Sequence, residues 1–268
     1  MTDLALRWAT QPAKASPAHW ARRLGIVRQF AQYYSALDPR TEIPPPQLLP
    51  YHYVRQPPYL YRDEEVTALI EAAACLPSPT GLRAATYATL FGLLAVTGMR
   101  ISEPIGLDRA DVDLEQGSLS IRGAKFGKSR WLPLHPTATA ELARYAERRD
   151  SLYPAPPTPS FYLSEQGTRL TTWSARWTFV KLSHQIGLRA PEDHHGPRPH
   201  DLRHRFAIRT LLHWYRCGDN VEQRLPQLAA YLGHAHVSDT YWYLSATPEL
   251  LALAARRLEP DRIGEGQP

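Results

Sequence analysis

The sequence has little cysteine and no long apolar run. Its two cysteines, Cys75 and Cys217, are too few and too far apart for a disulfide framework or a cysteine-based zinc site, so we expect two reduced thiols. No stretch of about 18 apolar residues is present, and the first residues lack the basic, apolar and small-residue order of a secretory signal. We therefore expect a cytoplasmic protein.

Internal repeats, heptad arrays and low-complexity tracts are also missing from the sequence, which excludes solenoids and long coiled coils. Hydrophobic residues make up 43% of the chain and charged residues 21%, an ordinary globular composition. Proline is the one excess, with 25 of 268 residues, and the prolines gather between segments. The net charge of +5 favours a polyanionic partner such as nucleic acid.

The first residues predict a short helical unit, assigned to residues 1–45. Apolar side chains recur there every three or four positions on one stripe: Trp20, Leu24, Val27, Phe30 or Ala31, and Tyr34. The arginines between them predict a basic face that either stays solvated or contacts DNA. Residues 46–58 are then rich in proline, which predicts a linker. Proline lacks an amide proton and restricts the backbone conformation of the residue before it, so neither a helix nor a central strand can continue. Residues 59–268 form the larger unit, with a helical tail over 245–268.

The sequence of the larger unit predicts mostly helices. Asp63 and Ser102 can cap two of them, and a mostly buried helix covers 84–97. Further helices fall at 137–149, 171–187, 200–215, 225–233, 237–243 and 248–258. Alternating apolar residues within 118–134 predict a β-hairpin with a basic tip at 123–129. The predicted fold class is mainly α with a small antiparallel β-sheet.

Several residues of the larger unit suit the cleavage of a phosphodiester without a metal. This reaction needs a nucleophile, cations that hold the non-bridging oxygens, and a proton donor for the departing sugar oxygen. Arg100 and Arg203 can hold the oxygens, since guanidinium forks bind phosphate in bidentate fashion. His200 precedes Arg203 by three residues on the same helical face. Lys125, at the hairpin tip, can reach a phosphate and act as a general acid.

Tyr243 is the candidate nucleophile. A phenol has a reference pKa of about 10, so it needs cationic surroundings to attack. His200 and His234 can donate hydrogen bonds to the phosphate or exchange protons with the tyrosine. Taken alone, each residue has a simpler interpretation as a surface, capping or packing residue. Arg100, for example, can be a salt-bridge partner of Glu103.

The order and spacing of these residues together resemble the tyrosine recombinases, the phage-integrase family. The family pattern begins with an arginine in a Thr-Gly-x-Arg-x-Ser-Glu box, matched by residues 97–103. It continues with a lysine in a β-hairpin before an x-Arg-x-x-Pro-Leu strand, matched by Lys125 and by Arg130 to Leu134. It ends with His-x-x-Arg, Leu-Gly-His and a tyrosine nine positions after that histidine, matched by His200 and Arg203, by 232–234 and by Tyr243.

The resemblance covers about residues 60–245 and implies a site-specific DNA recombinase. Its catalytic residues are then Arg100, Lys125, His200, Arg203, His234 and Tyr243. The nine-residue spacing selects Tyr243 over Tyr241. In the family the tyrosine forms a 3′-phosphotyrosyl bond while the lysine protonates the 5′-hydroxyl leaving group. The resemblance implies neither ATP nor a metal nor any other cofactor.

The resemblance also implies the partners of this chain. They are double-stranded DNA, three further copies in a tetramer that exchanges strands through a Holliday junction, and in some systems a second recombinase. Residues 1–45 would be a short counterpart of the family's core-binding domain, the DNA clamp, either because that unit is reduced or because the chain begins inside it. The chain would belong to a mobile element. The segment from Pro248 to about Leu258 would pack on a neighbouring protomer, although its apolar stripe also suits docking on its own domain.

Two other functions use the same residues in part. A type IB topoisomerase-like enzyme would relax DNA as a monomer without site specificity, and a DNA-binding accessory protein could keep the fold without catalysis. The complete residue set favours the recombinase, because a pure binder has no need of a tyrosine at that spacing. The histidines 194, 195, 200 and 204 suggest a metal site, but no well-spaced fourth ligand with a carboxylate is evident, so we expect none.

Overall fold

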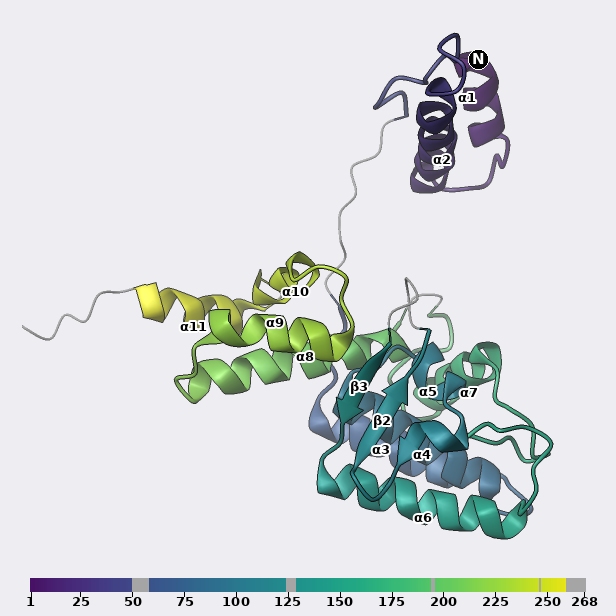
Figure 1. Cartoon of the computed structure of the whole chain (residues 1–268), viewed down its shortest axis with the longest axis vertical. Coiled ribbons are helices and arrows are strands. Elements are labelled where there is room, and N and C mark those ends of the chain that lie inside the picture. Colours follow the sequence, from purple (N-terminus) through teal and green to yellow (C-terminus); the bar gives the residue numbers. More distant parts are fainter. Residues whose placement is uncertain (50–57, 124–128, 194–195, 246, 259–268) are drawn as a thin grey trace, which may run out of the picture. The chain divides into compact units, whose positions relative to one another are not determined.

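A computed structural model describes residues 1–49, 58–123, 129–193, 196–245 and 247–258 (Figure 1). The chain divides into two compact units, Met1–Pro57 and Pro58–Pro268. Most of the predicted proline-rich linker lies outside the described residues, as does Lys125. Among the described helices, none is long and apolar enough to cross a membrane.

The first unit pairs two helices, α1 (Thr2–Thr10) and α2 (Pro17–Ser35). The Ser16 side chain accepts a hydrogen bond from the His19 amide at 3.3 Å and caps α2, and Pro17 occupies its first turn, where no amide proton is needed. A small core joins the helices through Ala5, Ala9 and Leu24.

The predicted apolar stripe of α2 is only partly buried. Leu24 and Ala31 are buried, whereas Phe30 and Tyr34 are exposed and stack on each other with ring centroids 5.9 Å apart. At the position where the periodicity left Phe30 or Ala31 open, Ala31 is thus the buried residue, while Tyr34 is an exposed member of the stripe.

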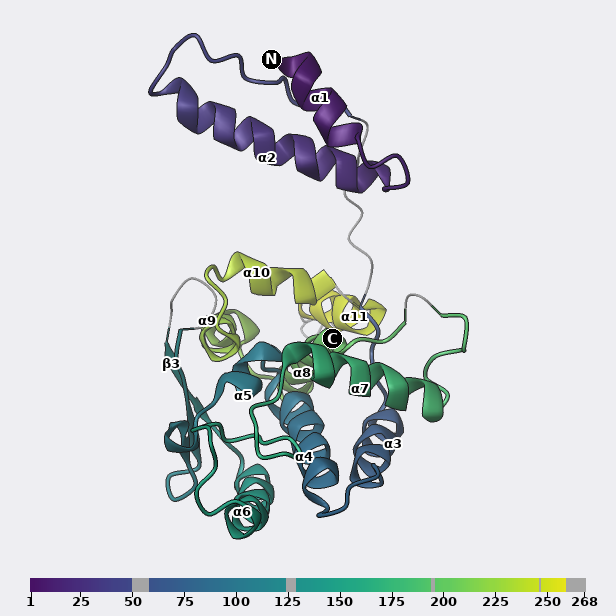
Figure 2. The ribbon, with the colours of Figure 1, turned by 90° about the vertical axis from the view of Figure 1, so that its right-hand side faces the viewer.

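The second unit contains most of the elements, and its helices match the predicted order. The helices are α3 (Asp63–Ala74), α4 (Leu82–Thr97), α5 (Ser102–Gly106), α6 (Pro136–Leu152), α7 (Thr172–Gln185), α8 (Pro199–Arg216), α9 (Val221–Leu232), α10 (Ser238–Tyr241) and α11 (Pro248–Leu258). The described residues also form the short 3-10 helices η1 (Arg109–Asp111) and η3 (Trp242–Ser245). Helix α4 is apolar almost all round, so it is buried between α3, α6 and α8 (Figure 2).

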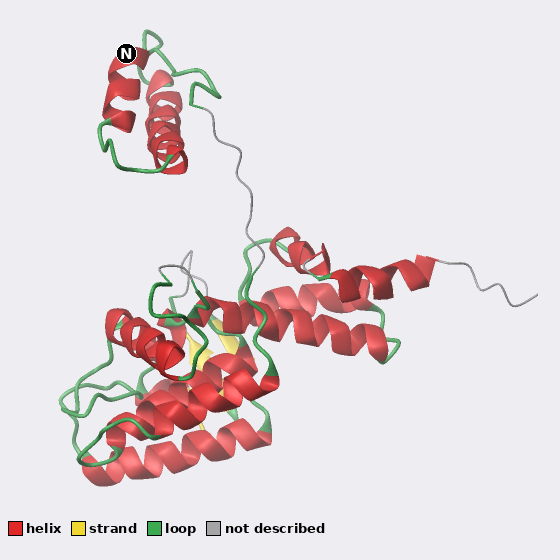
Figure 3. Ribbon diagram, turned by 180° about the vertical axis from the view of Figure 1, so that it is seen from behind, coloured by secondary structure: helices red, strands yellow, loops and turns green. Residues whose placement is uncertain are grey.

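The described strands form one antiparallel sheet in the order β1 (Val112–Asp113), β2 (Ser118–Ile121) and β3 (Arg130–Pro133), drawn in yellow in Figure 3. The register pairs Leu119 with Leu132, and both side chains are buried. The predicted hairpin is thus confirmed, while residues 124–128 of its tip lie outside the described residues. Strand β1 was not predicted, because two residues are too short to produce an alternation pattern.

Two helix starts differ from the prediction. Helix α3 is preceded by Arg62, whose amide donates to the Glu65 carboxylate at 2.8 Å, while Asp63 pairs with arginines of α8. Helix α5 starts at Ser102 without a side-chain cap, and the Glu103 carboxylate instead accepts the hydrogen bond of the Arg100 amide at 2.9 Å. In both cases a glutamate of the first turn accepts from a backbone amide just before the helix, and the residue expected as the cap makes no capping hydrogen bond.

Helix α8 links two hydrophobic cores. The larger core surrounds α4, and Leu202 of α8 belongs to it. The smaller core gathers later residues of α8 with α9, η3 and α11: Ala207, Ile208, Leu211, Leu225, Leu228, Leu232, Tyr243 and Leu250. The candidate residues of α8, Arg203 among them, therefore lie where the two cores meet.

Candidate active site

The end of helix α4 directs Arg100 toward the site. Gly98 ends the helix in the left-handed region with φ of +63°. A Cβ at Gly98 would stand 2.7 Å from the Phe206 ring of α8, so glycine is required both for the backbone conformation and for the close packing of α4 on α8. The Thr-Gly-x-Arg sequence thus ends the helix at Thr97 and places the arginine two residues beyond the glycine turn.

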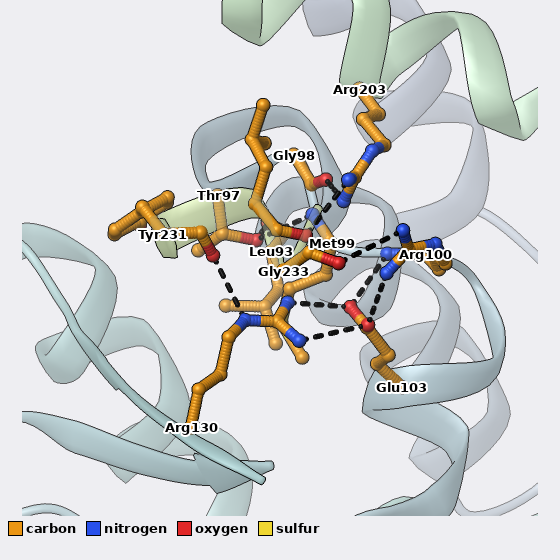
Figure 4. A network of polar contacts seen from close by, with 11 residues as sticks. Leu93, Thr97, Gly98, Met99, Arg100, Glu103, Arg130, Arg203, Tyr231 and Gly233 are labelled. Carbon is orange, nitrogen blue, oxygen red and sulfur yellow. Dashed lines mark hydrogen bonds and ion pairs between the residues drawn. The ribbon is translucent and has the colours of Figure 1, made fainter. Parts of the chain in front are cut away.

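Arginines from three distant segments meet at the C-terminal end of α9 (Figure 4). Each donates to one of three successive carbonyls: Arg130 Nε to Tyr231 at 2.9 Å, Arg203 Nη2 to Leu232 at 2.8 Å, and Arg100 Nη2 to Gly233 at 3.2 Å. Carbonyls in the last turn of a helix have no partner within it, and this end carries the negative pole of the helix dipole. The end of α9 therefore orients three cations at once.

Gly233 makes this arrangement possible. Its φ of +70° is a left-handed conformation that ends α9, and a Cβ would stand 2.7 Å from Arg130 Nη1. Any side chain at Gly233 would strain the turn and displace Arg130. The Leu-Gly-His sequence is thus explained by the arginines that it holds.

Glu103 joins two of the arginines through both of its oxygens. The buried carboxylate accepts from Arg130 at 3.0 and 2.9 Å, and from the Arg100 guanidinium at 3.1 Å. Burial alone would raise the pKa of Glu103, but the hydrogen bonds and charge of Arg130, with a further contribution from Arg100, lower this pKa below its ordinary value. Glu103 is therefore an ionised clamp that fixes the orientation of Arg100.

Arg203 is the most deeply buried cation of the site, with 1% of its surface exposed. Besides Leu232, its guanidinium donates to the Gly98 carbonyl at 2.9 Å, so it ties the ends of α4 and α9 together. Burial and the neighbouring charge of Arg100 lower the pKa of Arg203 to about 10, although Tyr243 opposes them. Arg203 remains charged at neutral pH.

His200 and His234 lie beside these arginines and are neutral at pH 7. Desolvation, followed by the charge of Arg203, lowers the pKa of each to about 4. His200 keeps contact with solvent at the start of α8. His234 is half-buried, and its Nδ1 lies 2.7 Å from the hydroxyl of the fully buried Thr240, which fixes the ring. Neutral imidazoles can donate or accept a proton.

Tyr243 occupies η3, directly after α10. Its side chain is 2% exposed, and its hydroxyl lies 3.1 Å from Nδ1 of His204. The ring lies nearly parallel to that of His234, with centroids 6.2 Å apart. By contrast Tyr241, the alternative nucleophile, is 55% exposed.

The structure brings together the sequence-predicted residues that it describes, namely Arg100, His200, Arg203, His234 and Tyr243. Lys125 lies outside the described residues. Glu103, His204 and Thr240 contact this group through polar atoms and were not assigned a catalytic role from the sequence. The four-residue spacing from His200 to His204 on one helical face is the signal that could have identified His204.

The low pKa of His234 predicts a pH-dependent stability. Because the unfolded chain binds a proton near pH 6.5 and the folded chain only near pH 4, the free energy of unfolding should fall as the pH drops through this window. We expect His234 to account for a loss of about 1 kcal/mol between pH 7 and pH 5, measured by urea unfolding. His234→Gln should lose less stability than the wild type over this interval. The exposed His236, changed to Gln, is the matched control and should behave like the wild type.

Comparison with known proteins agrees with this geometry. The model of the phage integrase family matches residues 60–249. The chain is 49% identical over 262 residues to y4rB of Sinorhizobium fredii, an integrase/recombinase by name, covering 96% of this chain and 83% of that protein. It is 32% identical over 229 residues to the tyrosine recombinase XerD of Staphylococcus epidermidis, covering 83% and 70%.

Solved structures share the fold. The XerH site-specific recombinase bound to its difH substrate after cleavage has a TM-score of 0.67 at 22% identity, covering 96% of this chain and 72% of that one. The Tn1549 transposon integrase in complex with transposon right end DNA has a TM-score of 0.63 at 17% identity, covering 97% and 85%. With the family match over residues 60–249, these findings place the chain in the phage integrase family, the tyrosine recombinases.

Proposed function

We propose that this recombinase cleaves and rejoins DNA at specific sites, with Tyr243 as its nucleophile. The observation that carries the proposal is the placement of the Tyr243 phenol among His204, His234 and the arginine cluster at the end of α9. Cationic and hydrogen-bonding neighbours are what a phenol needs to attack a phosphate. The nine-residue spacing from His234 and the family membership support the same residue.

The cleavage step then follows from the roles of the neighbours. The Tyr243 oxygen bonds to phosphorus as the bond to the 5′-oxygen breaks, which leaves a 3′-phosphotyrosyl enzyme. Arg100 and Arg203 offset the charge on the non-bridging oxygens, with Glu103 and the α9 carbonyls holding them in place. His200 and His234 donate hydrogen bonds to the phosphate. Attack by the free 5′-hydroxyl reverses the step, so rejoining needs no ATP.

Lys125 is the proposed proton donor to the 5′-oxygen. In sequence it stands between β2 and β3, and Arg130 at the start of β3 is held by Glu103 and the Tyr231 carbonyl. A hairpin whose base is anchored to the arginine cluster can deliver a lysine from its tip to the same phosphate. A lysine acts as a general acid when its pKa approaches the working pH.

DNA binding must change the site locally. Arg203 and Tyr243 are 1% and 2% exposed in the chain without DNA. A phosphate oxygen needs about 2.7–2.9 Å to a guanidinium nitrogen, and it cannot come this close to a group that solvent does not reach. We therefore propose that DNA is recognised first by exposed basic residues, and that Arg203 and Tyr243 become accessible in the complex.

We propose that four copies assemble on two DNA sites of a mobile element. A lambda integrase tetramer bound to a Holliday junction shares this fold, with a TM-score of 0.58 at 17% identity, covering 88% of this chain and 66% of that one. The small helical unit at residues 1–45 is the proposed DNA clamp, joined by residues 46–58 to the catalytic domain at 59–268. In one isolated chain α11 packs on α8 of the same chain, with Leu250 fully buried and Glu249 paired with Arg216.

Removal of residues 247–268 should weaken assembly on DNA. In the tetramer we expect α11 to exchange this docking for the equivalent surface of a neighbour, since the same apolar residues suit either partner. The truncated chain should form monomer complexes in a native gel at protein concentrations where the full chain forms tetramers. Removal of 259–268 alone, which spares α11, is the control. Equal tetramer formation by all three chains would contradict exchange of α11.

A plasmid carrying two copies of the host element's end sequence tests the function itself. A site-specific recombinase should convert it into two circles or an inverted product, with Holliday junctions as intermediates and a four-protomer complex on paired sites. Relaxation of any supercoiled plasmid by a monomer, without recombinant product, would instead support the topoisomerase-like function. Binding of the sites without strand cleavage would support the accessory protein.

A further inference from the structure

His204 is a buried histidine in contact with the proposed nucleophile. It follows Arg203 on α8, is 7% exposed, and its Nδ1 lies 3.1 Å from the Tyr243 hydroxyl. Its ring packs edge to face against His200 and Trp242, with centroid distances of 4.7 and 5.4 Å. These contacts fix the plane of the imidazole and direct Nδ1 at the phenol in the chain without DNA.

We infer that His204 accepts the phenolic proton when Tyr243 attacks the DNA phosphate, an inference that rests on the proposed role of Tyr243. As the bond from the tyrosine oxygen to phosphorus forms, the proton moves from that oxygen to Nδ1 of His204. The bond from phosphorus to the 5′-oxygen breaks, and Lys125 supplies a second proton to that oxygen. In rejoining, both protons return by the same routes.

The chemistry requires such an acceptor. A phenol with an ordinary pKa of about 10 is ionised to only about 0.1% at pH 7, so a base that takes the proton during attack raises the reactive fraction. A general base must lie within hydrogen-bond reach of the proton, about 2.6–3.2 Å between heavy atoms. The contact from His204 to Tyr243 meets this condition. Nδ1 accepts when Nε2 carries the ring proton.

The neighbouring histidine is oriented for another task. The ring plane of His234 lies 12° from that of Tyr243, with the centroids 6.2 Å apart, and its Nδ1 is engaged by the Thr240 hydroxyl. This nitrogen is therefore committed to Thr240, whereas Nδ1 of His204 contacts the phenol oxygen. The geometry thus separates the histidine that supports the tyrosine ring from the one that contacts its hydroxyl.

Two matched nicked duplexes distinguish proton transfer at the nucleophile from proton transfer at the leaving group. One carries the ordinary 5′-oxygen at the scissile phosphate, and the other carries 5′-sulfur, a leaving group that needs no proton. Both use the end sequence of the host element. Covalent adducts are measured for the wild type, His204→Ala, His204→Asn and the control Lys125→Ala, and DNA affinity is measured by gel shift for each.

We expect His204→Ala and His204→Asn to cleave both duplexes about 10²–10⁴-fold more slowly than the wild type, the range of general base catalysis, with little change in DNA affinity. Asparagine retains an acceptor near the phenol but cannot take a proton, so it should not restore cleavage. Lys125→Ala should be slow with 5′-oxygen and near wild type with 5′-sulfur. If His204→Ala does not fold, the cleavage rate of His204→Asn alone tests whether His204 accepts the proton.

Three results would overturn the inference while leaving the proposed function intact. Cleavage by His204→Asn within about threefold of the wild type would mean that His204 only positions the phenol, since general base catalysis contributes at least about 10²-fold. Restoration of His204→Ala by 5′-sulfur would place its role at the leaving group. Cleavage by His204→Ala as fast as by the wild type would mean that it has no role in attack. Absence of any wild-type adduct would instead overturn the proposed function, and the inference with it.

Discussion

Tyr243→Phe should abolish covalent attachment to DNA, with a cleavage rate at least about 10⁴-fold below that of the wild type. A phenyl ring has no oxygen to bond to phosphorus, whereas it fills the same space against the smaller core around α8 and α9. The folded state and the affinity for DNA should therefore persist. The measurement is the rate of adduct formation on a nicked duplex, followed on a denaturing gel, with a gel shift for binding.

Tyr241→Phe is the matched control, two residues away on the same segment. Tyr241 is 55% exposed, while Tyr243 is 2% exposed and in contact with His204. The Tyr241 variant should keep the cleavage rate within about threefold of the wild type, as for exposed residues outside the chemistry. A loss in Tyr241→Phe equal to that in Tyr243→Phe would show that the nine-residue spacing selects the wrong tyrosine.

Glu103→Ala should destabilise the protein by about 3–5 kcal/mol and also slow cleavage, since it leaves two partly buried guanidinium groups without their buried carboxylate. Arg130 would lose two hydrogen bonds, and Arg100 would lose one from its side chain and one from its amide. Arg100 would then be held mainly by the Gly233 carbonyl. Urea unfolding of the variant at pH 7 measures the loss.

The exposed ion pair of Glu141 with Arg144 on α6 provides the comparison. Glu141→Ala should change the free energy of unfolding by no more than about 0.5 kcal/mol, because water already solvates both charges. Glu103→Gln, which keeps the shape and part of the hydrogen bonding, should fall between the two alanine variants. A Glu103→Ala protein as stable as Glu141→Ala would refute the clamp.

Much of the site could be predicted from the sequence because residue type and spacing carry its chemistry. The Thr-Gly-x-Arg and Leu-Gly-His sequences mark both the arginine and the glycine turns that end α4 and α9. The helices of the second unit and the hairpin follow from local periodicity, which requires no knowledge of distant contacts.

The partners of the arginines could not be predicted, because they are set by tertiary contacts. The Arg130 side chain reaches the Tyr231 carbonyl across 101 positions, and the Arg100 side chain reaches Gly233 across 133. No local pattern indicates which helix end will accept a given guanidinium. The same holds for His204, which follows Arg203 in sequence but gains its role only when η3 packs against α8.

The two sequence interpretations of Arg100, as a salt-bridge partner of Glu103 and as a phosphate-binding residue, proved compatible. The ion pair exists at 3.1 Å, and the Arg100 side chain keeps 24% exposure. One edge of the planar guanidinium can be held by the protein while the other remains available to an anion. A structural partner for an arginine is thus no evidence against a role in the site.

Mass spectrometric mapping of the covalent adduct tests the central claim most directly. The wild-type protein is incubated with a nicked duplex from the end of its host element, digested, and sequenced by fragmentation. Trypsin leaves Tyr241 and Tyr243 on one peptide, Leu225–Arg256, so fragment ions must separate them. We predict a nucleotide attached to Tyr243. An adduct on Tyr241 or any other residue, or DNA binding without an adduct, would contradict the proposed mechanism.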